Sequence, residues 1–177
     1  EIIFYSAIAD FLGSLGTVIG HQNDRSISCN FQSFFSNVFQ LSSILWTLAF
    51  AVHVRASVTS LTPPKKVNVR IHFICWGFPM LVTLLALTTN RFGLLEGSSW
   101  CFLQNRSDSP SWGLAFWTIF SFYLWVILAM LGMMFSLASV YTWYNVNKIS
   151  CRRNLQLSEF SFDKLWYYPV IIILCWV

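Results

Sequence analysis

Residues 31–54 read FQSFFSNVFQLSSILWTLAFAVHV, a stretch without Lys, Arg, Asp or Glu. A helix rises about 1.5 Å per residue, so about 20 apolar residues cross a hydrocarbon core about 30 Å thick. The stretch is therefore long enough to span a membrane as a helix. Its polar residues recur at steps of three and four, which places them on one helical face. They are Ser33, Asn37, Gln40, Ser43 and Thr47.

The rest of the chain has the same character. Of its 177 residues, 56% are hydrophobic and 10% are charged, against roughly 25% charged in a soluble domain. The apolar residues form long blocks, which predict an all-α, polytopic membrane helix bundle in a single transmembrane domain over residues 1–177. We expect helices at about 2–20, 29–55, 70–90, 112–147 and 163–177. Because the chain opens on Glu1 and ends inside an apolar block, we interpret it as truncated at both ends.

The charges of the short loops predict how these helices are oriented. Lys and Arg are retained on the cytoplasmic side of a membrane. The loop after the second helix and the loop after the fourth are both net basic, so we place them inside. The basic residues that we expect to face the cytoplasm are Arg55, Lys65, Lys66, Lys148, Arg152 and Arg153. The alternate loops balance to zero charge, which places them outside.

Two of the five cysteines fall at the outer face in this arrangement. Disulfides persist on the oxidising side of a membrane. Cys29 and Cys101 are there, so a bridge between them is the one pairing that the topology allows, and two free thiols are the alternative. Asn105 begins an Asn-Arg-Ser sequon in the same outer loop, which predicts N-glycosylation.

Asp10 is the one acidic residue well inside an apolar block. A charged Asp at mid-membrane costs about 2.5 to 3.5 kcal/mol on insertion scales. Asp10 and Gln40 lie at similar depths, so we expect Asp10 to hydrogen-bond the polar face of the second helix near Asn37 or Gln40. A helix outside this sequence could equally supply its partner. The candidate ligand pocket or buried polar network comprises Asp10, Ser33, Asn37, Gln40 and Trp117; interhelical hydrogen bonding without a ligand is the alternative.

Two prolines predict helix kinks, because proline lacks the backbone N–H of a helical hydrogen bond. Pro79 follows Trp76-Gly77-Phe78, and Pro169 follows Tyr168 near the inner end of the last helix. A kink at the cytoplasmic end of a helix could serve as a pivot for a switch.

The sequence contains no recognisable motif for catalysis or for metal binding. His21, His53 and His72 are far apart in sequence and do not have metal-ligand spacing. The sequence lacks a Gly-rich phosphate loop, a nucleophile elbow and a carboxylate pair at helical spacing. We therefore expect no enzymatic activity, no metal and no cofactor. The basic loops are explained by topology and the lipid bilayer, so nucleic acid is not expected as a partner.

Several strings resemble one receptor family. They are CNFQSFF at 29–35, LWT at 45–47, IHFICWGFP at 71–79, YP at 168–169 and CW at 175–176. The chain resembles helices two to six of a seven-helix G-protein-coupled receptor of the cyclic-AMP receptor-like family, with secretin-type receptors next nearest. The Asp-Arg-Tyr triplet of rhodopsin-type receptors is absent, since the second helix ends His53-Val54-Arg55.

The resemblance implies an extracellular ligand, an outward movement of helix six, and a heterotrimeric G protein at the inner loops. Cys29 and Cys101 match the extracellular disulfide of the family, and Pro169 matches its helix-six kink. The ligand does not carry over; a cyclic nucleotide or another small molecule is expected, at a receptor in the plasma membrane. A multi-spanning transporter and a non-signalling membrane scaffold are the alternative functions.

Overall fold

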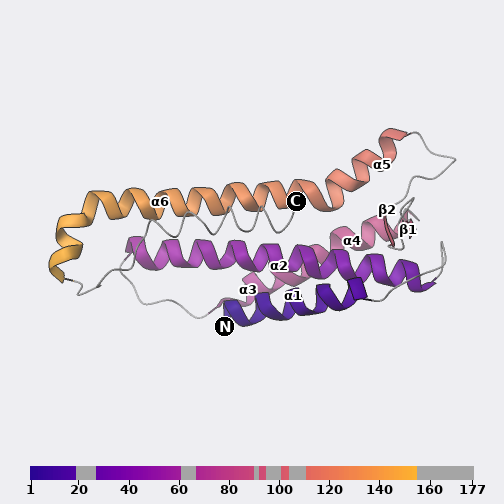
Figure 1. Ribbon diagram of the computed structural model, residues 1–177, viewed down its shortest axis with the longest axis horizontal. Coiled ribbons are helices and arrows are strands. Elements are labelled where there is room, and N and C mark those ends of the chain that lie inside the picture. The colour runs from indigo at the N-terminus through magenta and orange to yellow at the C-terminus, as the bar shows by residue number, and fades with distance from the viewer. Residues whose placement is uncertain (19–26, 61–66, 90–91, 95–100, 104–110, 155–177) are drawn as a thin grey trace. The chain divides into compact units, whose positions relative to one another are not determined.

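Figure 1 shows the computed structural model of the chain, which describes residues 1–18, 27–60, 67–89, 92–94, 101–103 and 111–154. Its elements, in chain order, are α1 (Ile2–Val18), α2 (Ile27–Ser60), α3 (Val69–His72), the π-helical turn η1 (Phe73–Gly77), α4 (Phe78–Thr88), β1 (Phe92–Leu94), β2 (Cys101–Leu103), α5 (Ser111–Thr118), the π-helical turn η2 (Ile119–Tyr123) and α6 (Leu124–Asn154). α3, η1 and α4 follow one another without interruption, as do α5, η2 and α6.

Three of the continuous helices are long and apolar enough to cross a membrane, which confirms the predicted fold class of a helical membrane bundle. They cover Ile27–Thr59, Val69–Thr88 and Trp112–Val146, and α1 is a shorter apolar helix. α2 extends beyond its predicted end at 55, to Ser60, and α6 beyond 147, to Asn154. The predicted helix at 163–177, with Pro169, lies outside the described residues.

The chain divides into two compact units. The first comprises Glu1–Thr47 and Val67–Leu128, and the second Leu48–Lys66 and Ala129–Val177. The boundary crosses α2 and α6 within their length, so each of these helices contributes to both units.

Small residues bring α1 close to the first half of α2 in the first unit. Ala9, Gly13 and Gly16 are buried on one face of α1. A Cβ atom at Gly16 would lie 2.5 Å from the Ser36 Oγ and 3.3 Å from the Ser36 backbone nitrogen. Helix association within lipid has little hydrophobic driving force and depends on such close packing of small residues. The glycine at 16 therefore sets the distance between the two helices.

An aromatic cluster joins α1, α2 and the α3–η1 segment. Tyr5 stacks on Trp46 with ring centroids 5.0 Å apart. The His72 ring meets Tyr5 edge-on at 4.7 Å and Trp46 at 5.0 Å. Trp76 contacts Trp46 at 6.1 Å and Phe39 at 6.0 Å. Trp46, which is fully buried, is thus the centre of a packing that draws on three helical segments.

The π-helical turn η1 precedes Pro79, where the sequence predicts a kink. The Phe78 N–H bonds to the Phe73 carbonyl, five residues earlier, instead of the α-helical four. Pro79 offers no N–H, and its ring would clash with the carbonyl four residues earlier in a regular helix. A wider turn before Pro79 relieves both constraints, because π turns accommodate one residue more than α turns.

A short hairpin between α4 and α5 was not predicted. β1 and β2 pair antiparallel, with Phe92 opposite Leu103 and Leu94 opposite Cys101. Phe92 and Leu103 form a buried cluster with Ala86 of α4, and the partly buried side chains against it are Leu87, Phe102, Leu114 and Trp117. Three-residue strands are too short to show a hydrophobic alternation, which explains why the sequence predicts only a loop.

In the second unit, the end of α2 packs against α6. The Leu48 side chain of α2 packs against Gly132 of α6. Its Cδ1 lies 2.8 Å from the position that a Cβ atom at residue 132 would take. About two turns further along α2, the Arg55 guanidinium carbon lies 4.8 Å from the centre of the Phe135 ring. This cation–π contact fixes the arginine against a helix of its own unit.

Substitution of the two α1 glycines by alanine should have different consequences. We expect Gly16→Ala to lower the free energy of unfolding by about 1 to 3 kcal/mol, because an added methyl group overpacks the contact with Ser36. Gly13→Ala is the matched control, since its Cβ would lie at an ordinary 3.5 Å from the Gln40 Cγ. The measurement is thermal unfolding of the purified full-length protein. Equal losses from both substitutions would contradict the close approach at Gly16.

Candidate functional site

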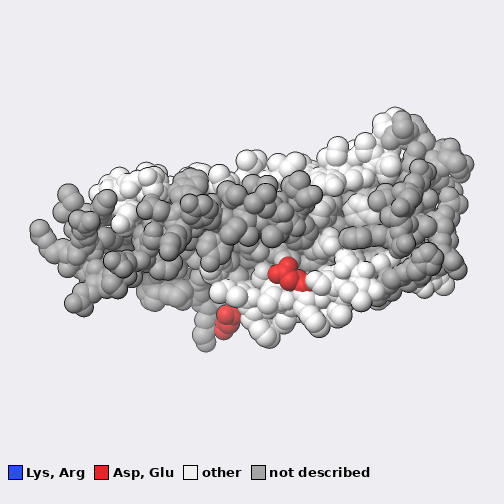
Figure 2. All heavy atoms as spheres, viewed as in Figure 1, with Lys and Arg blue, Asp and Glu red and all other residues white. Residues whose placement is uncertain are grey.

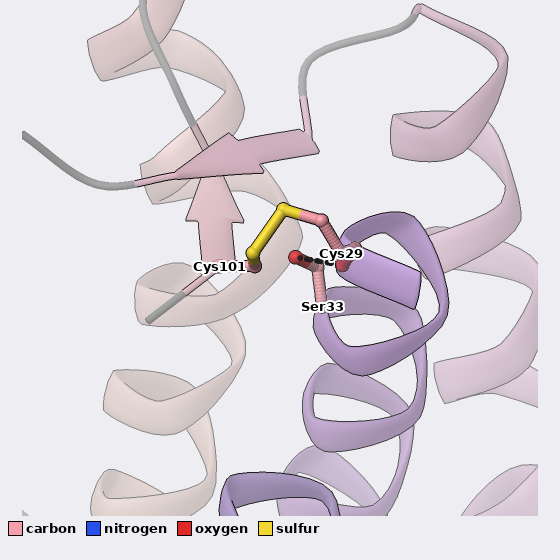
Figure 3. The surroundings of a disulfide bond; sticks show 3 residues. All are labelled: Cys29, Ser33 and Cys101. Atoms are coloured by element: carbon pink, nitrogen blue, oxygen red, sulfur yellow. Dashed lines mark hydrogen bonds between the residues drawn. A yellow bond between two sulfur atoms is a disulfide. The ribbon is translucent and has the colours of Figure 1, made fainter. Parts of the chain in front are cut away.

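A disulfide joins the start of α2 to the hairpin (Figure 3). The Cys29 and Cys101 sulfur atoms are 2.09 Å apart and their Cα atoms 5.4 Å apart. Both residues are fully buried. Ser33, one turn along α2, donates its hydroxyl to the Cys29 carbonyl at 3.0 Å. The bridge therefore ties β2, and with it the buried cluster under the hairpin, to the first turn of α2.

Asp10 is bonded to the polar face of α2. The Ser43 hydroxyl donates a hydrogen bond to the Asp10 carboxylate. The partner is thus the stripe residue that follows Gln40 by one turn, and not Asn37 or Gln40 themselves. The Ser43 carbonyl in turn accepts from the Thr47 hydroxyl at 2.9 Å. Glu1 and Asp10 are the acidic residues of the described part, and the face in Figure 2 is otherwise without described charges.

Asn37 is the most unusual residue of the polar face. Its side chain is fully buried, and neither amide atom has a hydrogen-bond partner within the described part of the chain. An unpaired buried polar group costs about 1 to 3 kcal/mol. Ser36, Thr83 and Ser121 each hold a buried hydroxyl, and Trp46 a buried indole nitrogen, for which the described residues show no partner. Asn37 differs from them in having two such atoms, the amide nitrogen and the amide oxygen.

The remaining candidates for the pocket are Gln40 and Trp117. Gln40 is half-buried beside Gly13 of α1. Trp117 is half-buried against the cluster under the hairpin, and its ring meets Phe120 at 5.9 Å. The structure brings Asp10 to Ser43 and Ser33 to Cys29, but it gives no contact between Trp117 and Asn37.

At the predicted cytoplasmic side, Arg55 is the described candidate, held over Phe135. Asn105, Lys65 and Lys66 lie outside the described residues. The positions of Lys148, Arg152 and Arg153 are in α6, but their side chains are not described.

Two features that shape this region could not be predicted from the sequence. One is the aromatic cluster at Trp46 and His72, whose members come from three segments and so share no periodicity. The other is Trp125, whose indole N–H donates to the Phe120 carbonyl at 2.7 Å. A Trp five residues after a Phe is not a recognisable motif, and only the π-helical turn between them makes the bond possible.

A family model described as slime mold cyclic AMP receptor matches residues 2–177. The chain belongs to this family. Cyclic AMP receptor-like protein A of Dictyostelium discoideum is 26% identical over 109 residues, 61% of this chain and 29% of that protein. Cyclic AMP receptor 1 of the same organism is 25% identical over 170 residues, 95% of this chain and 41% of that protein. G-protein coupled receptor 157 of Mus musculus is 25% identical over 138 residues, 73% of this chain and 41% of that protein.

Membership of the slime mold cyclic AMP receptor family confirms the resemblance that the sequence strings predict. The family is one of receptors and not of enzymes, and the chain is accordingly a receptor-like membrane protein. The chain spans between 29% and 41% of the length of the relatives described above.

Loss of the disulfide should loosen the hairpin and lower stability. The bridge closes a loop with a sequence separation of 72, for which the chain-entropy model gives about 4 kcal/mol. We expect reduction by dithiothreitol to lower the thermal unfolding temperature of the wild-type protein, and a Cys29→Ser/Cys101→Ser variant to unfold at that same lower temperature with or without reductant. A wild-type protein that is insensitive to reductant would contradict this.

Proposed function

We propose that this chain is the part from helix two to helix six of a seven-helix G-protein-coupled receptor in the plasma membrane. It binds a small extracellular ligand among the outer halves of its helices and activates a heterotrimeric G protein through its basic inner loops. Family membership supports the receptor class, and the names of the relatives support a cyclic nucleotide as the first ligand to test.

The observation that carries the ligand site is the buried Asn37 amide. Asn37 follows Cys29 by eight positions, about 12 Å along the helix. It therefore lies on α2 some two turns below the disulfide that holds the hairpin. A side-chain amide with an unmet donor and an unmet acceptor is complementary to a ligand that offers both kinds of group. Binding such a ligand would satisfy a group that is otherwise costly to bury.

Asn37 also distinguishes a ligand site from a structural contact. If the amide contacts ligand, Asn37→Leu removes a buried unpaired group from the ligand-free protein and does not lower its stability. If instead the amide is bonded to another helix of the full-length protein, the same change breaks that bond. The free energy of unfolding of the ligand-free receptor then falls.

Arg55 supports the signalling half of the proposal. Its side chain lies against Phe135 of α6. Because the guanidinium of arginine remains charged and offers several donors, it suits a partner surface rich in carbonyls and carboxylates. Arg55 is thus a candidate to bind the G protein at the place where α2 packs against α6.

The test uses full-length receptor in membranes with purified heterotrimeric G protein. We expect cyclic AMP to accelerate the exchange of bound GDP for a labelled GTP analogue. Asn37→Leu should weaken cyclic AMP binding about 10- to 100-fold, the equivalent of one or two hydrogen bonds of about 1.4 kcal/mol each. Arg55→Gln should reduce exchange at saturating cyclic AMP while binding is unchanged.

Two control variants accompany these changes. Asn145→Leu removes an exposed amide of α6, and Arg70→Gln removes an exposed arginine at the start of α3; neither should affect cyclic AMP binding. Absence of cyclic AMP binding to the wild type would exclude that ligand. Exchange that stays at the rate of receptor-free membranes, with bound cyclic AMP, would favour a scaffold that no longer signals.

A further inference from the structure

The helix from 111 to 154 contains a π-helical turn that no proline explains. η2 covers Ile119–Tyr123, and the described residues around it include no proline. The Leu124 N–H bonds to the Ile119 carbonyl, five residues earlier, which leaves the Phe120 carbonyl without the donor that it would have in an α-helix. Isolated π turns are rare, and they occur often at functional sites.

The side chain of Trp125 compensates for this loss. Its indole Nε1 donates to the Phe120 carbonyl at 2.7 Å. In a membrane, a backbone carbonyl without a donor is costly, because no water is present to replace the lost bond. The indole–carbonyl bond therefore stabilises the π turn relative to a regular α-helix. In a regular α-helix, the Leu124 N–H would donate to the Phe120 carbonyl instead.

The Trp125 ring is also held from a second helix. Phe78 meets it edge-on, with ring centroids 4.5 Å apart. Phe78 is the first residue of α4 and directly follows η1, so the ring pair connects the regions of η1 and η2, the π-helical turns of the described residues. On the other side, Phe120 contacts both Trp125, at 6.4 Å, and the pocket candidate Trp117, at 5.9 Å. A continuous series of rings thus leads from Trp117 to α4.

We propose that the hydrogen bond from the Trp125 indole to the Phe120 carbonyl sets the rotational phase of α6. Breaking it converts η2 into an α turn and rotates the following part of α6 by one residue position. Because one residue corresponds to about 100° around a helix, the change presents a different face of α6 to its surroundings. The part of the proposal that makes this rotation a signalling step rests on the proposed receptor function.

The exposure pattern of α6 offers a direct measurement of its phase. Met134 is 40% and Phe135 62% exposed, whereas Met133 and Ser136 are 4% and 1% exposed. A lipid-soluble aryl diazirine, photolysed in the membrane, inserts into side chains that face lipid. Mass spectrometry of the full-length receptor should therefore find label at Met134 and Phe135. When η2 becomes an α turn, each later residue of α6 takes the angular position that the next residue had before. Met133 then takes the exposed position of Met134, and Phe135 the buried position of Ser136.

The deciding variant is Trp125→Phe, which keeps an aromatic ring against Phe78 but removes the N–H. We expect its label to move by one residue, with Met133 gaining label and Phe135 losing it. Ligand-independent nucleotide exchange on the G protein should change in the same variant. Trp112→Phe is the matched control, because Trp112 lies in the same continuous helix and is 70% exposed; its labelling should remain that of the wild type.

A rescue variant separates a change of phase from general damage. Deletion of Ile119 removes the additional residue of the π turn, so an α turn then leaves the rest of α6 in its original phase. The double variant, Trp125→Phe with Ile119 deleted, should recover the wild-type labelling. If Trp125→Phe fails to accumulate, accumulation of the double variant supports the proposal, and its failure to accumulate contradicts it.

The labelling and the nucleotide exchange test separate parts of the proposal. Unchanged labelling in Trp125→Phe would overturn the role of the hydrogen bond. Shifted labelling with unchanged exchange would overturn its role in signalling. If the wild-type receptor itself drives no exchange with any ligand, the proposed function fails, while the labelling still decides whether the Trp125 bond sets the phase of α6.

Discussion

The packing of α1 against α2 depends on the hydrogen bond from Ser43 to Asp10. Asp10 is otherwise exposed on α1, and an acidic side chain exposed to a hydrocarbon core would need a protein partner, because that core contains no water. Asp10 can reach α2 because small residues on α1, above all Gly16, let the two helices approach closely. The bond and the close packing thus depend on each other. Together they hold the first half of α2, with its polar face, against α1.

The placement of α2 determines what its other residues can do. Cys29 is buried at one end, where the disulfide holds the hairpin, and Asn37 is buried between the disulfide and Ser43. A lipid-facing helix could not keep the Asn37 amide without partners, since the cost would favour exposing it or replacing it. Its burial without a described partner is the physical reason for the proposal that Asn37 binds ligand.

Much of this could be predicted from the sequence, and the rest could not, for identifiable reasons. Long apolar blocks predict the helices, and loop charge brings Cys29 and Cys101 to one face, where the structure joins them. Periodicity predicts the polar face but not which of its members meets Asp10. The partner Ser43 depends on the relative shift of two helices along their axes, which Gly16 determines and periodicity does not report. Likewise, the hairpin strands are too short for a pattern, and the bond of Trp125 depends on a π turn that has no sequence signature.

A double-mutant cycle between Asp10 and Ser43 tests this account most directly. The free energy of unfolding of the full-length receptor would be measured for the wild type, Asp10→Ala, Ser43→Ala and the double variant. We expect a coupling energy of about 1 to 2 kcal/mol, in the range of favourable side-chain hydrogen bonds in proteins. Additivity within about 0.3 kcal/mol would show that the two side chains do not interact. The hydrogen bond between Ser43 and Asp10 could then not be what positions α2 against α1.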